Sequence, residues 1–229
     1  MKFRSVPLAW LDNMPLPAVE SYCFVGTADL ARVDDETLLN PSERRRLEML
    51  IREGDRRCFL AAHVLKRKVL GKILKQDPGA VQVVLGEWNK PKLVNSDWHF
   101  NLSHSGCWVA LAVSRRGPIG MDIEQESARA MNLPAARILH PRDLLQGRVV
   151  DEHARLLTIW CLKEAIAKCD GRGLGIAFNC IQLAVSADGR CLGRYHGMSW
   201  HARYVLLPGG VHLAFASEEI LSPLCLQIV

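Results

Sequence analysis

Residues 99–124 of the chain read HFNLSHSGCWVALAVSRRGPIGMDIE. The segments HFNLSH and CWVALAVS are rich in apolar residues and flank a glycine turn, so they predict a β-hairpin. After a Gly-Pro turn, residues 119–123 predict a third strand. Alternate side chains of a strand project from one face, so Asp122 and Glu124 are expected side by side on this strand.

Two neighbouring carboxylates repel each other, which raises the pKa of one of them unless a cation lies between them. One interpretation of Asp122 and Glu124 is therefore a site for a positively charged group. The other interpretation is that the strand simply ends there and both acids are solvated. Residues 117–124 fit both interpretations when they are considered alone.

A second segment, LLTIWCLKEAIAKC at residues 156–169, is apolar almost all round and predicts a largely buried helix over residues 154–168. At 100° per residue, Glu164 and Lys168 lie on one side of this helix with Trp160, and Lys163 lies away from them. A surface Glu-Lys pair would stabilise the helix by only about 0.3–0.5 kcal/mol. The apolar neighbours on the same side favour a buried site, where charges need paired partners or a metal.

Three carboxylates without histidine or thiolate suit a hard cation such as Mg²⁺, which usually completes its coordination with water and substrate phosphate oxygens. The chain also has a basic block, defined here as residues 42–75, with eleven Lys/Arg and four Asp/Glu, although its overall net charge is only +5. Such a block indicates either phosphates or an acidic partner, or else two solvated helix faces.

Composition sets the broad class. The chain has 229 residues, 49% hydrophobic and 23% charged, which is typical of a globular protein of one large or two small domains. No apolar run is long enough for a membrane span, and the proline-interrupted start does not resemble a signal peptide. The eight cysteines form no CxxC pair. This pattern argues against a zinc site or a disulfide framework and favours a cytoplasmic location.

The remaining elements are assigned from periodicity and turn residues. Residues 106–114 (GCWVALAVS) and 209–217 (GGVHLAFAS) share a glycine turn followed by a small-residue strand, which hints at two related α+β halves. Ser42 is a possible cap of the first basic helix. The further expected elements are helices over residues 43–53 and 55–74, a broken helix over 129–146, and strands over 81–87, 181–185, 201–207 and 211–216.

Two quoted segments carry a family resemblance. HFNLSHSGCWVALAVSRRGPIGMDIE followed by IWCLKEAIAKCDGRGL resembles the signature pair of the Sfp-type 4'-phosphopantetheinyl transferases. That family is marked by an NLSHS segment, a (G)xDxE strand end and a WxxKEAxxK helix. The wider resemblance extends from about residue 40 to residue 183, and the three motifs in this order and spacing are far more specific than any one of them.

The resemblance implies transfer of the 4'-phosphopantetheine arm of coenzyme A to a serine of an apo acyl or peptidyl carrier protein, of the holo-acyl-carrier-protein synthase type, with release of adenosine 3',5'-bisphosphate. The implied partners are coenzyme A and the carrier, with no role for nucleic acid or membrane. The implied fold is α+β: a monomeric pseudo-dimer of two similar halves with the active site in the cleft between them. The halves are expected at residues 1–116 and 117–229.

The resemblance also implies roles for the charged residues. Asp122, Glu124 and Glu164 would coordinate Mg²⁺. Glu164 would also act, directly or through a metal-bound water, as the base on the incoming serine. Lys168 would stabilise or protonate the leaving diphosphate oxygen. Lys163 matches the lysine that precedes the family's glutamate, but its side of the helix makes a structural role equally compatible.

Coenzyme A phosphates would be bound by Ser103, His104 and Lys90, the last in an Asn-Lys-Pro segment where the family usually has Gly-Lys-Pro. One position departs from the family pattern, because Cys58 stands where many members have an arginine that grips the 3'-phosphate. Arg57 is assigned to that role, with Arg56 or the arginines of residues 44–46 as alternatives.

Within the basic block, lysines not needed for coenzyme A are expected to steer an acidic carrier toward the cleft, with Lys66, Lys68 and Lys72 as first candidates. Two rival functions remain. A magnesium-dependent nucleotide hydrolase would share the acid cluster but would not need a carrier. A non-catalytic relative that only binds coenzyme A or carrier would be expected to have lost one of the four acid and lysine residues.

Overall fold

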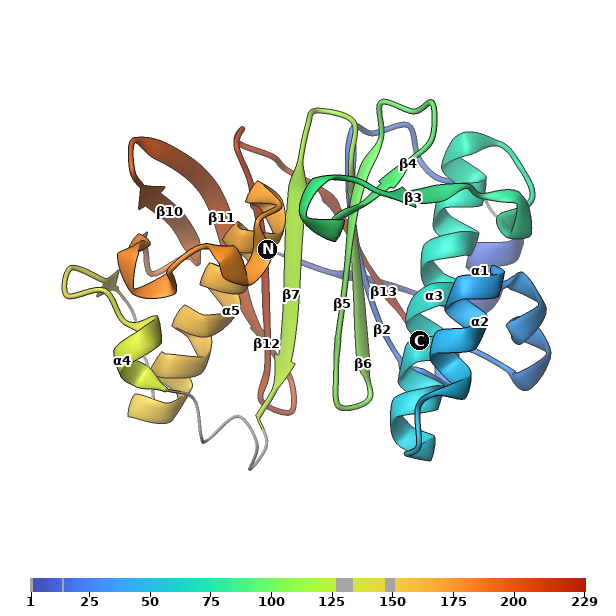
Figure 1. The fold of residues 1–229 in the computed structure, drawn as a ribbon, viewed down its shortest axis with the longest axis horizontal. Helices are drawn as coiled ribbons and strands as arrows, with labels where there is room; N and C mark the ends of the chain where they lie inside the picture. Colours follow the sequence, from blue (N-terminus) through green and yellow to red (C-terminus); the bar gives the residue numbers. More distant parts are fainter. Residues whose placement is uncertain (1, 14, 127–133, 147–150) are drawn as a thin grey trace.

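The computed structural model describes residues 2–13, 15–126, 134–146 and 151–229, and its elements form two adjoining α+β halves (Figure 1). The first sheet has the strand order β1-β13-β2-β6-β5 and the second has the order β7-β12-β11-β10-β9-β8. The strands of the first sheet are β1 (Arg4–Val6), β13 (Leu224–Ile228), β2 (Ser21–Thr27), β6 (Trp108–Ser114) and β5 (His99–Ser105). Those of the second are β7 (Ile119–Gln125), β12 (Val211–Ser217), β11 (Met198–Leu207), β10 (Arg190–Tyr195), β9 (Gln182–Val185) and β8 (Leu144–Leu145).

One long helix covers each sheet (Figure 1). Helix α3 (Glu53–Leu74) packs on the first sheet and α5 (Glu152–Asp170) on the second, which confirms the two long helices expected from the sequence. The shorter elements are α1 (Leu8–Asn13), α2 (Pro41–Glu48), α4 (Ala135–Ile138) and the small hairpin of β3 (Val83–Leu85) and β4 (Pro91–Leu93).

The two halves repeat one arrangement. In the first half β6 lies between β2 and β5, and in the second half β12 lies between β7 and β11, always in antiparallel pairs. The two segments with similar sequence are these central strands, and their last residues, Ser114 and Ser217, are paired with Ser21 and Ile119 respectively. The predicted α+β pseudo-dimer is therefore confirmed.

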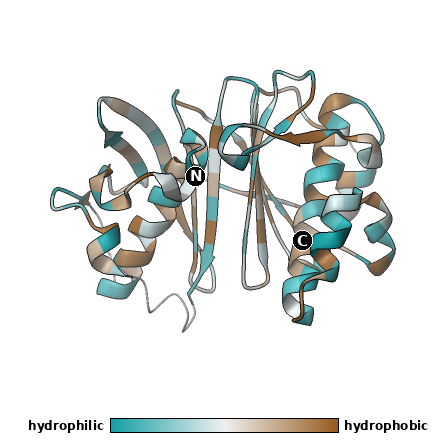
Figure 2. Cartoon of the chain, viewed as in Figure 1, coloured by the Kyte–Doolittle hydropathy of each residue, from teal (hydrophilic) through white to brown (hydrophobic). Residues whose placement is uncertain are grey.

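Three apolar clusters hold this framework together. One lies between the first sheet and α3, and a second lies between the second sheet and α5. A third joins the opposite faces of the two sheets, with Val25 and Ala112 on one side and Met121 and Phe215 on the other. In Figure 2 brown residues alternate with white and teal along the strands, whereas the outer helix α2 is largely teal. Apolar burial between sheets and helices is the main stabilising contribution.

The start of the basic block differs from its prediction. A single helix over residues 43–53 is wrong, because α2 ends at Glu48 and α3 begins at Glu53 after an extended Arg52. The N-cap is Asn40 rather than Ser42. The Asn40 side chain accepts a hydrogen bond from the Glu43 amide at 2.8 Å, and the Glu43 carboxylate accepts one from the Asn40 amide at 2.9 Å. This reciprocal capping box satisfies two backbone donors, and the Ser42 hydroxyl donates to Asn40 Oδ1 at 2.8 Å.

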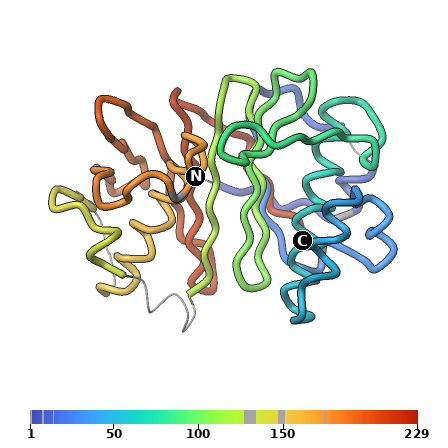
Figure 3. The backbone as a smooth tube through the Cα atoms, in the orientation of Figure 1, coloured from blue at the N-terminus to red at the C-terminus, as the bar shows by residue number. Residues whose placement is uncertain are grey.

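The C-terminal strand also differs from its prediction. Residues 117–229 were assigned to the second half, yet β13 pairs in parallel with β2 and β1 of the first sheet. Figure 3 shows the C-terminal segment returning to the first half. This strand covers the outer edge of β2, where unpaired backbone groups would otherwise be exposed. A boundary near residues 115–117 stays a prediction.

The expected broken helix over residues 129–146 lies partly outside the described residues. Within residues 134–146 the structure has only α4 and the short strand β8. The buried Lys163 holds this segment in place. Its ammonium donates to the Ile138 carbonyl at 2.8 Å and to Asp143 at 2.7 Å. Lys163 therefore has a structural role, since it fastens this segment to α5.

Candidate active site at the junction of the two sheets

Strand β7 presents two chemically different faces. Its odd-numbered residues Ile119, Met121 and Ile123 are buried in the cluster between the sheets. Its even-numbered residues face α5. The close approach of α5 depends on Gly120, because a Cβ atom there would lie 1.9 Å from the Ala165 carbonyl oxygen. A glycine at this position therefore brings the helix directly onto the strand that carries the two acids.

Asp122 is the most buried acid of the site, with only 2% of its surface exposed. Its Oδ1 accepts hydrogen bonds from the Ser103 hydroxyl at 2.9 Å and from the Lys168 ammonium at 2.6 Å. Lys168 also donates to Ser103 Oγ at 3.1 Å. The second carboxylate oxygen of Asp122, Oδ2, is buried and has no hydrogen-bond partner among the described residues. A buried carboxylate oxygen without a donor is costly, so a further positive or donating group fits here.

Glu124 is held at both of its oxygens. Oε2 accepts a hydrogen bond from the Ser105 hydroxyl at 2.6 Å, and Oε1 accepts one from the Trp160 indole at 3.3 Å. Burial raises the pKa of Glu124, and the nearby charge of Asp122 raises it further. The predicted repulsion between the two strand acids is therefore present in the structure.

Glu164 and Lys168 lie one helical turn apart on α5 and have opposite electrostatic situations. Burial raises the pKa of Glu164 to about 7; Lys168 opposes this rise, and Asp122 and Glu124 add to it. Burial alone would lower the pKa of Lys168, but the adjacent Asp122 carboxylate and Glu164 raise it overall. Near neutral pH, Lys168 is thus a cation, while Glu164 is poised to exchange a proton.

Side chains of β5 connect the two sheets at this site. The amides of Met121, Ile123 and Gln125 are on the outer edge of β7, which is the end strand of its sheet and pairs with no further strand there. They donate instead to Asn101 Oδ1 at 2.8 Å, Ser103 Oγ at 3.3 Å and Ser105 Oγ at 3.2 Å, respectively. These three side chains alternate along β5, so they share one face. The β5 clamp, as we call Asn101, Ser103 and Ser105, therefore fixes the acids of β7 against the first half.

The donor set fits a hard cation in its chemistry. It offers carboxylate oxygens only, one of them unpartnered, and two acids whose pKa is raised by burial and like charge. The ligands are not assembled as a metal cluster, however, because no group of three or more His, Cys, Asp or Glu in the described segments is arranged to hold an ion. Lys168 instead neutralises Asp122. Mg²⁺ binding by Asp122, Glu124 and Glu164 stays a prediction.

Two cavities flank the segment that joins β3 and β4. Lys90 lines the larger, of about 590 Å³, together with Trp88, Trp98 and Arg172. Its ammonium donates to the Cys169 carbonyl at 2.7 Å, and burial lowers its pKa. The carbonyl belongs to the C-terminal turn of α5, where cations are favoured.

The smaller cavity, of about 370 Å³, is lined by His104, by Asn40, Ser42 and Glu43 at the start of α2, and by His63 and Lys66 of α3. Burial lowers the pKa of His104, and the charge of Lys168 lowers it further. The sequence grouped Lys90 with His104 as phosphate ligands, and the structure places them on two adjacent cavities.

Arg57 has its ion-pair partner outside the cluster of carboxylates. Its guanidinium forms an exposed ion pair with Asp29 at 2.7 Å. Cys58 is buried, and its thiol contacts the Trp108 carbonyl at 3.5 Å, so it contributes no charge to a phosphate site. The role of Arg57 toward the 3'-phosphate therefore stays a prediction.

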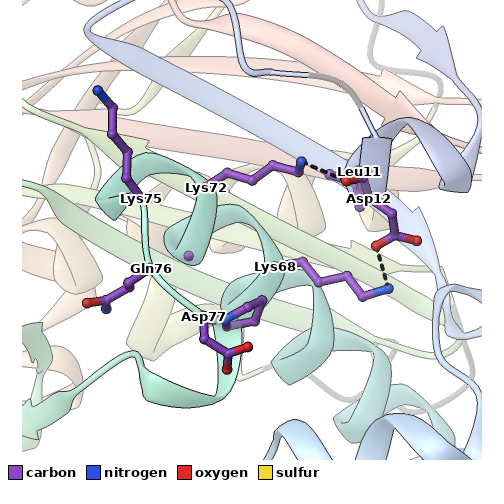
Figure 4. Close-up of a pocket in the computed structure, with 9 residues that line it drawn as sticks. Leu11, Asp12, Lys68, Lys72, Lys75, Gln76 and Asp77 are labelled. Carbon is purple, nitrogen blue, oxygen red and sulfur yellow. Dashed lines mark hydrogen bonds and ion pairs between the residues drawn. The ribbon is translucent and has the colours of Figure 1, made fainter.

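The basic block is less exposed than its composition indicates. Lys66 is only 4% exposed and its ammonium is bound by Glu43 and by His63 Nδ1. Its selection as a steering residue is wrong, because a buried and neutralised charge exerts little field in solvent. Lys68 pairs with the Asp12 carboxylate at 2.9 Å and Lys72 donates to the Asp12 carbonyl at 3.2 Å, as Figure 4 shows. Both lysines thus hold α1 against α3.

Several site residues were not identified from the sequence. Gly120, Ser105 and Asn101 act on the acids through packing or hydrogen bonds, and Trp160 was noted only for its side of the helix. The alternation of polar residues at 101, 103 and 105 was a usable signal, because those positions share a face of a strand. The residues that this face contacts depend on how the two sheets pack against each other, which the sequence pattern does not contain.

Fold and site together define a pseudo-dimeric α+β protein whose buried acid–lysine cluster draws on both halves. Comparisons with known proteins give the family. A family model described as 4'-phosphopantetheinyl transferase, N-terminal, matches residues 34–116, and the 4'-phosphopantetheinyl transferase superfamily model matches residues 118–216. The chain belongs to the Sfp-type 4'-phosphopantetheinyl transferase family.

Three relatives illustrate the range of similarity. The 4'-phosphopantetheinyl transferase Sfp of Bacillus subtilis is 27% identical over 159 residues, which cover 67% of this chain and 70% of that protein. A putative 4'-phosphopantetheinyl transferase of Synechocystis is 28% identical over 181 residues, 76% of this chain and 68% of the relative. The 4'-phosphopantetheinyl transferase AcpT of Salmonella typhimurium is 31% identical over 125 residues, 52% and 62% respectively.

The segments described include no helix both long enough and apolar enough to cross a membrane.

Proposed function

We propose that this chain transfers the 4'-phosphopantetheine arm of coenzyme A to a serine hydroxyl of an apo acyl or peptidyl carrier protein, with Mg²⁺, and releases adenosine 3',5'-bisphosphate. Within the family it would act as a holo-acyl-carrier-protein synthase. The observation that supports this proposal best is the buried Asp122, held by Ser103 of the first half and Lys168 of the second. Each of these residues lies in a segment matched by the family models.

The proposed metal ligands are Asp122, through its unpartnered Oδ2, together with Glu124 and Glu164. A bound Mg²⁺ would supply charge neutralisation of the coenzyme A diphosphate. Ser105 and Trp160 hold the Glu124 carboxylate in a fixed orientation for this purpose. The three acids repel one another, and a cation at this position would remove that repulsion.

Lys168 is proposed as the residue that binds the leaving diphosphate oxygen and donates a proton to it. Its ammonium is retained at neutral pH because the neighbouring carboxylates raise its pKa. Asp122 and Ser103 fix the position of the ammonium through contacts of 2.6 and 3.1 Å. Such fixed charges stabilise developing negative charge without reorganisation.

Glu164 is proposed as the base that accepts the proton of the carrier serine. A general base works best when its pKa lies near the working pH. In the metal-free protein burial raises the pKa of Glu164 to about 7, and a cation held by the neighbouring acids would lower it from there. No described side chain donates a hydrogen bond to this carboxylate. It therefore keeps an oxygen available to an incoming hydroxyl.

The nucleotide part of coenzyme A is proposed to occupy the cavities beside Lys90 and His104, whose side chains would contact its phosphates. We further propose that the enzyme acts as a monomer, because one chain supplies both halves of the site. All eight cysteines are free thiols, six of them buried, which supports a cytoplasmic location. Nucleic acid and membrane have no part in this proposal.

The proposal is tested by mass spectrometry of a panel of apo carrier proteins incubated with the enzyme, coenzyme A and Mg²⁺. We expect one or more carriers to gain the mass of phosphopantetheine on the acceptor serine, and a serine-to-alanine carrier to gain nothing. Coenzyme A breakdown that proceeds equally well without carrier would instead identify a diphosphate hydrolase. Binding of coenzyme A without any turnover would identify a non-catalytic relative.

A further inference from the structure

The turn between α2 and α3 exposes apolar side chains in an unusual way. Ile51 is 97% exposed and Met49 is 70% exposed, whereas Leu50 between them packs against the small apolar cluster under α2. Leu50 therefore anchors the turn and directs its two neighbours into solvent. Burying them in a partner would remove apolar surface from water.

Unpaired arginines surround these two side chains. Arg45 and Arg46 lie one helical turn before Met49, and Arg52 directly follows Ile51. All three are exposed, and within the described segments none of their guanidinium groups has a hydrogen-bond or ion-pair partner. We call these five residues the α2–α3 turn patch.

The neighbouring arginines differ because the protein itself uses them. Arg44 donates to the Glu36 carbonyl, Arg56 donates to the Leu47 carbonyl, and Arg57 pairs with Asp29. Two acids, Glu48 and Glu53, also lie at this turn, so the patch is basic but not uniformly so. Its uncompensated charge comes from arginine, a residue type enriched at protein interfaces along with methionine.

The α2–α3 turn patch lies at the same end of the molecule as the β5–β6 turn and the end of β7 (Figure 1). Helix α3 begins there and is tied to the hairpin by the contact of Cys58 with the Trp108 carbonyl at 3.5 Å. The charge of Asp55, in the first turn of α3, also acts on His104 of the NLSHS segment. A partner bound to the patch would therefore stand beside the site.

We propose that the α2–α3 turn patch docks the protein substrate, through carboxylates arranged around an apolar side chain, so that its serine reaches the cluster of Glu164 and Lys168. This inference rests on the proposed function. The patch takes the carrier-binding role that the sequence predicted for Lys66, Lys68 and Lys72. The structure shows these lysines to be buried or engaged within the chain.

A protein fits the patch better than other anionic ligands. Coenzyme A phosphates would gain nothing from two exposed aliphatic side chains. Nucleic acid would favour aromatic side chains on which bases stack, and the patch has none. A membrane-binding surface needs a long apolar face, whereas this turn offers only Met49 and Ile51.

The test uses two variants, Ile51→Ser and Arg52→Glu. Neither residue is among the arginines considered for binding the 3'-phosphate of coenzyme A. Each is compared with a matched surface change far from the turn, Ile220→Ser for the 69% exposed isoleucine and Arg194→Glu for an exposed arginine of β10. The readouts are KM for the apo carrier that the parent modifies fastest, KM for coenzyme A, kcat, and carrier binding by fluorescence anisotropy. Thermal unfolding verifies that every variant is folded.

We expect each turn variant to raise carrier KM and carrier Kd by about tenfold, which corresponds to about 1.4 kcal/mol. Coenzyme A KM and kcat at saturating carrier should stay within about twofold, and the control variants should match the parent. A carrier KM equal to that of the controls would overturn the docking surface while transfer by the parent still upheld the proposed function. Equal increases in the two KM values would assign the patch to coenzyme A and would also overturn it.

Discussion

The two halves of this protein place different residues at equivalent positions of the same framework. Phe24 of β2 is paired with Leu111, and Asp122 of β7 is paired with Ala214. Leu111 and Ala214 occupy the same place in the two similar central strands, so Phe24 and Asp122 are equivalent. The first half fills its helix-facing position with a fully buried aromatic ring, and the second fills it with a carboxylate. The first half thus contributes stability where the second contributes chemistry.

The outer edges of the two equivalent strands are also satisfied differently. The edge of β2 is paired with the strand β13, which completes a regular sheet. The edge of β7 is bonded by the side chains of the β5 clamp. Side chains satisfy the amides but hold the sheets farther apart than a ladder would, because a side chain stands between the two main chains. The edge of β7 is therefore joined to the first half through side chains, whereas the edge of β2 is closed by a strand.

The largest expected effect is a loss of activity when Asp122, the counterpart of Phe24 in the second half, is substituted. Asp122→Asn keeps the shape of the side chain but removes its charge, so it should reduce carrier modification by about 10³–10⁴-fold, or about 4–5.5 kcal/mol of transition-state stabilisation. The variant loses the ion pair with Lys168 but also the repulsion with Glu124, and these two changes oppose each other, so it should remain folded. Mass-spectrometric initial rates measure the loss. Activity within about tenfold of the parent would show that the charge is not needed.

At the equivalent position of the first half, Phe24→Ala should act on stability instead. Loss of a fully buried ring that stacks near Tyr22 at 5.8 Å should lower the free energy of unfolding by about 3–5 kcal/mol. Urea unfolding gives this value, with Val33→Ala as the control, because Val33 is 80% exposed. The molecules that remain folded should keep the parental kcat. A loss of kcat larger than the loss of folded protein would contradict the division of roles.

The acids of the second half should also make its stability depend on pH. Burial is the main cause that raises the Glu164 pKa from 4.5 to about 7. The folded protein then holds one more proton than the unfolded chain between these pH values. Stability should therefore fall as the pH rises from about 4.5 to 7, by up to about 3 kcal/mol.

This dependence can be measured by urea unfolding of the metal-free enzyme at several pH values in the presence of a chelator. Glu164→Gln should flatten the slope over that range, because the amide does not titrate. Equal slopes for the parent and the variant would mean that another group carries the effect. Added Mg²⁺ should stabilise the parent above pH 7 more than it stabilises the variant.

The smallest expected effect tests the side-chain edge of β7. Ser105→Ala removes the hydrogen bonds to Glu124 and to the Gln125 amide, which should lower the free energy of unfolding by about 1–2 kcal/mol. Amide hydrogen exchange in residues 119–125 should become faster, whereas exchange in β2 should not change. Ser199→Ala, at an exposed strand position, is the control. Unchanged exchange in β7 would show that the serine does not hold this edge.

The sequence by itself determined the repeated framework and the chemistry of the acids. Alternation along residues 119–125 places Asp122 and Glu124 on one face, and helical spacing places Glu164 beside Lys168. The similar segments at 106–114 and 209–217 indicated two halves, and both became central strands. These features are local, because strand and helix periodicity depend on neighbours a few residues away.

Only the tertiary structure decided which partners those side chains meet. Lys66 reads as one more cation of a basic block, yet it is buried against Glu43, a residue 23 positions earlier in the chain. The C-terminal strand joins the first sheet beside β2, and the β5 clamp meets β7 across the junction of the two sheets. Each of these contacts depends on how separate elements pack, and packing is set by the sum of many distant apolar contacts that no local pattern contains.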